Sequence, residues 1–138
     1  IEISYWKSKH NAQVKNIIAI DYGERFIGLA IKKKSLNTPY PLKVLDSKDI
    51  NILSEIKKIL VDNNIEEIVV GYPIGLNNHE TRMTKVVDEF ISKSLSKISD
   101  LPVFTTDERM TSKIINDKKQ RTDDLAAVEI LNSYLLND

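Results

Sequence analysis

The amino-acid sequence predicts an α/β protein with a five-stranded mixed sheet and helices on both faces. Two uninterrupted apolar runs, at residues 17–20 and 68–70, are typical of strands buried on both faces. Apolar residues at helical spacing follow at 49–61 and 80–98. A chain of 138 residues is about one domain with its own core. We expect that domain at 16–138, preceded by an N-terminal extension at 1–15.

The order of elements predicts the topology of the sheet. Strands are expected at 16–21, 26–33, 40–45, 65–71 and 102–105, and helices at 49–61, 80–98, 112–117 and 124–136. The turn at 22–25 is so short that the first two strands must form an antiparallel hairpin. Right-handed crossovers then bring the fourth and fifth strands beside the first and parallel to it. Asp49 is the expected cap of its helix. Four residues of the last helix are expected to face inward: Leu125, Val128, Leu131 and Leu135.

Composition excludes several classes of function. The chain has no cysteine, which removes disulfides, thiolate metal sites and cysteine nucleophiles. Its two histidines lie far apart, so a zinc site is not expected. Twenty basic and twenty acidic residues give zero net charge, which argues against coating nucleic acid through bulk electrostatics. Without a membrane-span pattern or a signal sequence, the protein is expected in the cytoplasm.

Asp21 is the first candidate for chemistry. It ends the first buried strand, where a carboxylate lies at the rim of the core and needs a cation or hydrogen-bond donors. Gly23 and Gly28 remove side-chain bulk nearby, so a phosphate or another strand could approach the backbone. The alternative is that Asp21 is an ordinary turn residue.

Further carboxylates are expected at the same edge of the sheet. Asp107 and Glu108 follow the fifth strand, and the last helix begins near Asp123 and Asp124. Ligand sites in open sheets lie outside the carboxyl ends of the strands, and such a nest suits Mg²⁺ or Mn²⁺. Each acid also has an ordinary explanation, because Asp123 can cap its helix and acids in a first turn favour the helix dipole.

Four motifs in order carry a resemblance to a known family. They are Asp-x-Gly-x-[Lys/Arg]-x-Ile-Gly-x-Ala at 21–30, Val-Gly-x-Pro at 70–73, Asp-Glu-Arg-x-Thr-[Ser/Thr] at 107–112, and Asp-x-x-Ala-Ala from 123, followed by Ile-Leu and Tyr-Leu pairs. Over residues 16–136 the chain resembles the YqgF family, also called RuvX, of the RNase H-like superfamily. The resemblance implies an RNase H-like fold.

The resemblance also implies an activity and its residues. The family is linked to nuclease maturation of the 5′ end of 16S ribosomal RNA, and an older label for it is Holliday-junction resolvase. By position, Asp21, Glu108 and Asp123 would be the catalytic and metal-binding acids, with Mg²⁺ or Mn²⁺ as cofactor and Asp107 as a substitute for Glu108. Asp124 occupies a position that is not acidic in the family pattern. The candidate substrate-binding residues are Arg25, Arg109, Thr111, Asn77 and Arg82.

The implied partner is nucleic acid: precursor ribosomal RNA or a small-subunit precursor particle first, branched DNA second. Symmetric resolution of a junction would require a homodimer, but no dimer face is identifiable in the sequence. The sequence departs from the family at Arg25-Phe26, where Lys-Arg is common, so one phosphate contact is missing. It also departs after the Val-Gly-x-Pro turn, where the loop reads Gly75-Leu76-Asn77-Asn78.

Two other classes of protein compete with the nuclease. Actin-like and sugar-kinase-like ATP binders share the strand-Asp-x-Gly-hairpin device, but they need two such domains and this chain has room for one. A non-catalytic RNA- or protein-binding module would keep the fold without needing three acids.

Overall fold

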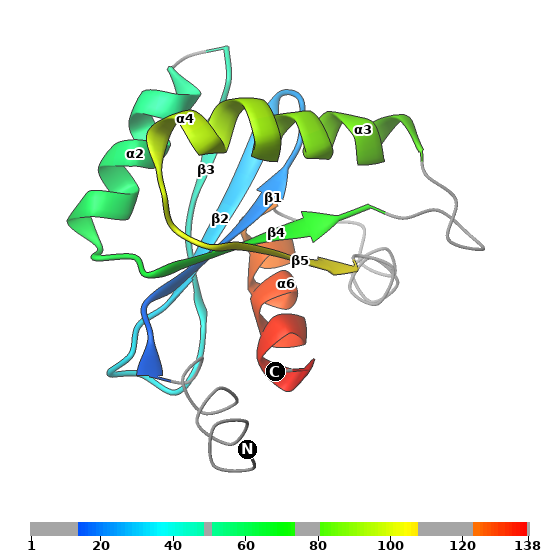
Figure 1. Ribbon diagram of the computed structural model, residues 1–138. Helices are drawn as coiled ribbons and strands as arrows, with labels where there is room; N and C mark the ends of the chain where they lie inside the picture. The colour runs from blue at the N-terminus through cyan, green and yellow to red at the C-terminus, as the bar shows by residue number, and fades with distance from the viewer. Residues whose placement is uncertain (1–13, 49–50, 74–80, 108–122, 138) are drawn as a thin grey trace, which may run out of the picture.

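One mixed sheet organises the molecule. The computed structural model describes residues 14–48, 51–73, 81–107 and 123–137. Its strands are β1 (Ile17–Tyr22), β2 (Phe26–Lys32), β3 (Tyr40–Asp46), β4 (Glu67–Tyr72) and β5 (Val103–Asp107), in the order β3-β2-β1-β4-β5. β2 runs antiparallel to β1 and β3, whereas β4 is parallel to β1 and β5 is parallel to β4 (Figure 1). The predicted topology is confirmed.

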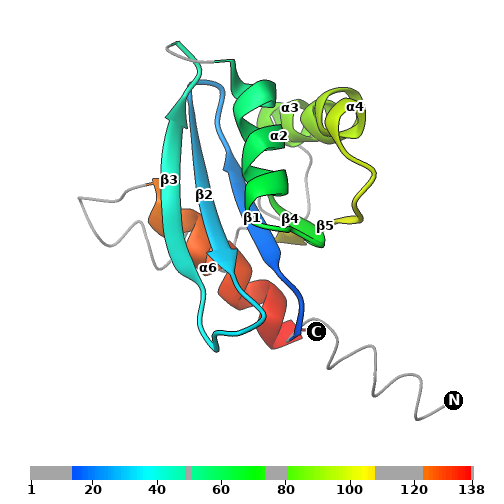
Figure 2. The same cartoon turned by 90° about the vertical axis from the view of Figure 1, so that its left-hand side faces the viewer.

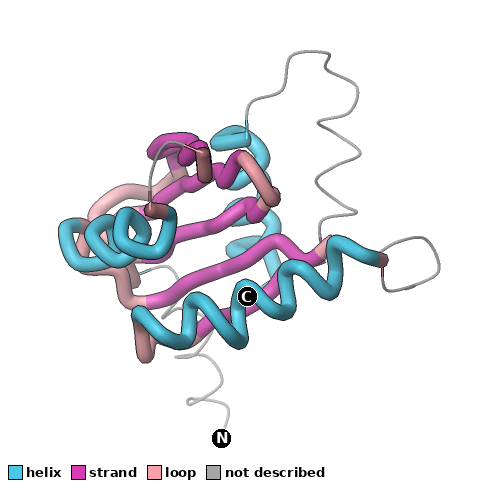
Figure 3. The backbone as a smooth tube through the Cα atoms, turned by 90° about the horizontal axis from the view of Figure 1, so that it is seen from above, coloured by secondary structure: helices cyan, strands magenta, loops and turns pink. Residues whose placement is uncertain are grey.

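Helices cover both faces of the sheet, as predicted. α2 (Ile52–Asp62) lies on one face with α3 (Arg82–Glu89), the π-helical segment η3 (Phe90–Leu95) and α4 (Ser96–Ile98), and α6 (Asp123–Asn137) lies on the other (Figure 2). α3, η3 and α4 follow one another as a continuous helical rod (Figure 3). Within the described ranges, no helix has the length and apolar character needed to cross a membrane.

The strands divide the core into two apolar clusters, because successive side chains of a strand point to opposite faces. Ile18 and Ile20 of β1 belong to the cluster under α2 and α3. Ile17 and Ala19 belong to the cluster under α6. This alternation assigns each later residue of a strand to a face of the sheet.

Two helix starts differ from the expectation. The cap of α2 is Asn51, whose side chain accepts a hydrogen bond of 3.2 Å from the Ser54 amide. Asp49, the expected cap, lies outside the described residues. α3 begins after Thr81, which forms a reciprocal capping box with Thr84. The expected helix at 112–117 also lies outside the described residues.

The prediction for the inward face of α6 was wrong at Leu125, which is 48% exposed. The prediction is confirmed at Leu131, which is fully buried, and Val128 and Leu135 pack against the same cluster while partly exposed. Ala126, Ala127 and Ile130 complete the buried face. Small alanine side chains let the helix approach the strands closely, so Ala126 and Ala127 are buried near its start where Leu125 is not.

Polar contacts connect the parts of the chain at the end of the sheet where the central strands β1 and β4 begin. The Glu67 carboxylate accepts hydrogen bonds of 3.0 Å from Lys15 Nζ and from the Tyr134 hydroxyl of α6. Asn16 donates to the Asn64 carbonyl at 3.1 Å and accepts from the Lys34 amide at 2.9 Å. Since Asn16 and Glu67 are both buried, these partners compensate the loss of water.

Candidate active site

Asp21 lies at the opposite, carboxyl-end edge of the sheet. It is paired with Gly28 across the β1–β2 hairpin and is half-buried. Ile17 and Ala19 of the same strand pack under α6, so alternation puts Asp21 on the α6 face. Gly28 presents no side chain beside this carboxylate. The strand therefore delivers an acid to the rim of the core, next to a buried glycine on the neighbouring strand.

Asp107 reaches the same edge but belongs to the other face of the sheet. It ends β5, opposite Tyr72 of β4. Thr106 contacts Ser133 of α6 at 3.4 Å between hydroxyl oxygens, so Thr106 is on the α6 face. By alternation, Asp107 falls on the face of α2 and α3. The edge shared by Asp21 and Asp107 is the predicted one, but the two strand positions point in opposite directions.

Asp123 is the first residue of α6, the helix that covers the face of Asp21. The expected approach of this helix start to the acid edge rests on the backbone alone, because the side chains of Asp123 and Asp124 lie outside the described residues. Glu108, Arg109, Thr111 and Asn77 lie outside them as well. Among the side chains that the structure does describe, no group of three or more acidic or histidine residues forms a metal cluster.

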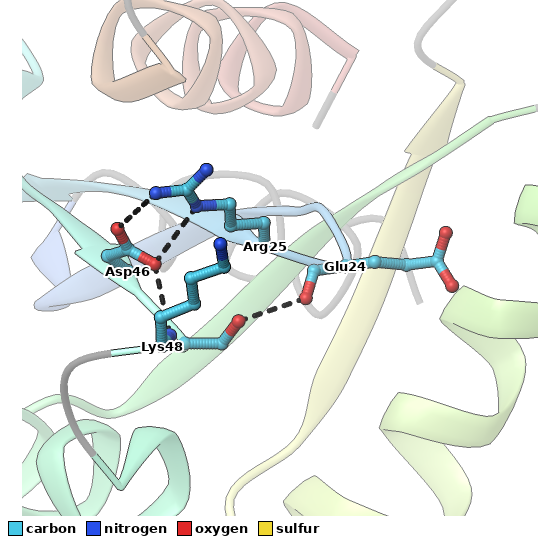
Figure 4. A network of polar contacts seen from close by, with 5 residues as sticks. Glu24, Arg25, Asp46 and Lys48 are labelled. Carbon is cyan, nitrogen blue, oxygen red and sulfur yellow. Dashed lines mark hydrogen bonds and ion pairs between the residues drawn. The ribbon is translucent and has the colours of Figure 1, made fainter.

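The tip of the β1–β2 hairpin is held by the end of β3. Arg25 contacts Asp46 through Nε at 3.4 Å and through Nη2 at 3.3 Å (Figure 4). Ser47 donates to the Arg25 carbonyl at 2.8 Å and to the Glu24 carbonyl at 3.1 Å. The Lys48 amide donates to Asp46, and this bond, together with Arg25, holds the pKa of Asp46 below its usual value. Arg25 therefore sits in a fixed position.

The second described candidate, Arg82, is also ion-paired. Its Nη2 lies 2.8 and 2.7 Å from the two carboxylate oxygens of Glu24. Glu24 raises the pKa of Arg82 through this hydrogen bond and through its charge. The contact joins the start of α3 to the hairpin tip, although the two lie far apart in the sequence. Both described basic candidates thus have carboxylate partners that the sequence analysis missed, and only spatial proximity could have revealed them.

Tyr22, the residue after Asp21, fixes the strand end from the other face. Its ring stacks on Phe90 with centroids 4.0 Å apart. Burial raises the pKa of its hydroxyl, and the nearby Glu24 charge adds to that effect. Phe90 is the first residue of the π-helical segment, so this segment supplies the aromatic ring that packs against the residue next to the candidate acid.

Comparison with known proteins identifies the relatives of this chain. The family model RuvX, described as Holliday junction resolvase, matches residues 15–137. A protein of Dictyoglomus turgidum is 34% identical, with 86% of this chain and 92% of the relative covered. A protein of Mycoplasma mobile is 38% identical, with 87% and 91% covered. Both carry the name "Putative pre-16S rRNA nuclease".

A solved structure supports the fold. Thermus thermophilus RuvC, solved in complex with a Holliday junction substrate, superposes with a TM-score of 0.57. The match covers 88% of this chain and 90% of that one, at 14% sequence identity. At this identity the likeness concerns the fold alone, and it agrees with the predicted RNase H-like architecture.

Proposed function

This chain belongs to the RuvX family, and from that premise we propose that it is a metal-dependent endonuclease that hydrolyses phosphodiester bonds of precursor 16S ribosomal RNA. The observation that carries the proposal is the place of Asp21. It is a half-buried carboxylate at the carboxyl end of a central strand, on the face covered by the helix that begins at Asp123. The names of the curated relatives support the RNA substrate.

The proposed ligands are Asp21, Glu108 and Asp123. Carboxylate oxygens are the donors that hard divalent cations prefer, so the chemistry of this set fits Mg²⁺ or Mn²⁺. Such an ion, when bound, activates water and stabilises the leaving oxygen of the cleaved bond. Asp107 is the weaker alternative to Glu108, because alternation along β5 turns it away from the face of Asp21.

The remaining side chains would bind and orient the RNA. Arg25 and Arg82 flank the hairpin tip and are 52% and 71% exposed. Each is paired with a carboxylate, so a phosphate would have to share or replace that partner. Asn77, Arg109 and Thr111 are proposed as further contacts from their positions in the family motifs. Zero net charge suits a nuclease that takes part of its binding surface from a precursor particle.

Cleavage of a Holliday junction is the second candidate, favoured by the description of the matching family model. The deciding experiment compares a precursor 16S 5′-leader RNA with a four-way DNA junction, each in Mg²⁺ and in Mn²⁺. We expect preferential cleavage of the leader, abolished in Asp21→Asn. Preferential, symmetric cleavage of the junction would reverse the order of substrates. Cleavage unchanged by Asp21→Asn would reject the three-acid mechanism, and RNA binding without any cleavage would indicate a non-catalytic module.

A further inference from the structure

Phe26 is an exposed aromatic residue at the start of β2. It keeps 42% of its surface exposed and belongs to neither apolar cluster of the core. A ring left in water has no stabilising role in the folded chain comparable to that of a core residue. Its position in the sequence is one of the two departures from the family pattern, since a basic residue is common there.

The ring lies on the same face of the sheet as Asp21. Asp21 pairs with Gly28, and Phe26 is two residues from Gly28 along β2, so alternation gives these three residues one face. Diagonal neighbours across an antiparallel pair lie roughly 7–8 Å apart. Asp21 and Phe26 are such neighbours, and Gly28 adds no side chain between them.

The residues directly opposite the ring on the paired strands are small or charged. On the β1 side, the hairpin continues as Gly23, which turns so tightly that an added Cβ would lie 2.5 Å from the Phe26 carbonyl oxygen. On the β3 side, Phe26 pairs with Asp46. The nearest apolar side chain on the paired strands is Val44 of β3, a diagonal neighbour opposite Gly28, and it is itself 38% exposed.

Arg25 lies over the Phe26 ring, so a cation and an aromatic ring form one surface. Its guanidinium carbon lies 4.7 Å from the Phe26 ring centroid, within cation–π range. Asp46 holds Nε and Nη2, which leaves Nη1 without a hydrogen-bond partner among the described residues. A fixed cation and an exposed ring thus stand side by side. That combination suits a nucleotide, whose base stacks on aromatic rings and whose phosphate attracts the cation.

We propose that Phe26 is a stacking platform for an unpaired base of the substrate strand next to the scissile phosphate, with Arg25 contacting the adjoining phosphate. The inference rests on the proposed function, because it takes the substrate to be nucleic acid cut at Asp21. It assigns this site a preference for a strand that is not base-paired at that nucleotide. The aromatic residue replaces a phosphate contact with a contact to a base.

The test measures binding separately from cleavage. The catalytically silent background is Asp21→Asn, and the probe is a fluorescent precursor 16S 5′-leader RNA, intact or with single abasic nucleotides placed in turn on both sides of the cleavage position. We expect Phe26→Ala to weaken binding of the intact RNA by at least roughly 5-fold, as loss of one base–aromatic stack predicts. Phe26→Trp should restore binding. An abasic nucleotide at one position of the RNA should weaken binding to the Asp21→Asn protein that retains Phe26. The same RNA should bind the Phe26→Ala variant as well as the intact RNA does.

Phe104→Ala is the matched control. Phe104 is 41% exposed, lies on β5 away from the hairpin and packs on Tyr134 with centroids 5.7 Å apart. It should leave RNA affinity unchanged, and thermal melting shows whether each variant is folded. Equal affinity of Phe26→Ala and its parent would overturn the proposal, as would a loss that is the same at every abasic position. A further outcome is that the protein that retains Asp21 binds RNA with the expected dependence on Phe26 and yet shows no cleavage. In that case the nuclease proposal fails and the stacking site stands.

Discussion

Arg82 at the start of α3 donates from one nitrogen to both carboxylate oxygens of Glu24, at 2.8 and 2.7 Å, and thereby fastens the tip of the β1–β2 hairpin to the helical rod. The residue proposed to meet a substrate phosphate is therefore neutralised by a carboxylate of the same chain. Substrate binding at Arg82 has to compete with Glu24.

Glu24→Gln should strengthen RNA binding by releasing Arg82. Each additional phosphate contact steepens the dependence of log Kd on log salt concentration by about one. Titrations of the leader RNA from low to high salt measure that slope. The same substitution in an Arg82→Ala background should have a smaller effect. If both backgrounds respond equally, Glu24 acts only as a distant negative charge and not through Arg82.

Asp21→Asn should abolish most cleavage, whereas Asp107→Asn should leave it nearly unchanged. The two carboxylates share an edge of the sheet but occupy different faces, and only the face of Asp21 carries the start of α6. Asp21→Asn should lower the single-turnover rate by at least roughly 100-fold, as loss of a metal-binding carboxylate predicts. Asp107→Asn should stay within a few-fold of the parent protein. A strong loss in Asp107→Asn would assign that acid to the site.

The interaction between Asp46 and Arg25 should stabilise the fold at neutral pH and be lost only in acid, when the Asp46 carboxylate is protonated. The Lys48 amide and Arg25 hold the pKa of Asp46 below its unfolded value, so its contribution to stability is present above that value. The contribution disappears as pH falls through the lower, folded pKa. Denaturant unfolding of the parent protein and of Asp46→Asn should therefore differ near neutral pH and converge at low pH. A difference that grows on acidification would contradict the sign of the shift.

Ile130→Ala and Leu125→Ala test the face of α6 that the structure buries. Ile130 is fully buried, so its truncation should cost about 2–5 kcal/mol of unfolding free energy. Leu125 is 48% exposed, and its truncation should cost less than about 1 kcal/mol. Urea unfolding measures both changes. Equal costs would mean that Leu125 packs against the sheet as Ile130 does.

The sheet was predictable from sequence because its signals are strong and local. The run at residues 17–20 is buried on both faces, and the short turn before residue 26 leaves only a hairpin for the next strand. On α6 the inward position of Leu131 was predictable as well, but the exposure of Leu125 was not, because Leu125 is more apolar than Ala126 and Ala127 and these smaller residues fit closer to the strands. Packing distance decides that choice, and a single sequence does not contain it.

The candidate site was predictable only in part for a related reason. The motif around Asp21 marks the acid, and the strand order brings Asp107 to the same edge. The partners of Arg25 and Arg82 follow neither from motif nor from periodicity, because Asp46 and Glu24 are distant in the chain and meet them only in the fold. Side-chain pairing between separate elements is a tertiary property.

The hydrogen bonds of Glu67 with Lys15 and Tyr134 show that the two ends of the central strands differ in role. Where β1 and β4 begin, hydrogen bonds join α6 to these strands, so the charged groups there stabilise the packing of the helix on the sheet. At the other, β1 ends with Asp21 and Tyr22 and β4 ends with Tyr72, beside the candidate active site. Substitutions where the strands begin can therefore tune how firmly the molecule holds together while its chemistry stays intact, and the end beside the candidate active site can change its substrate without rebuilding the core.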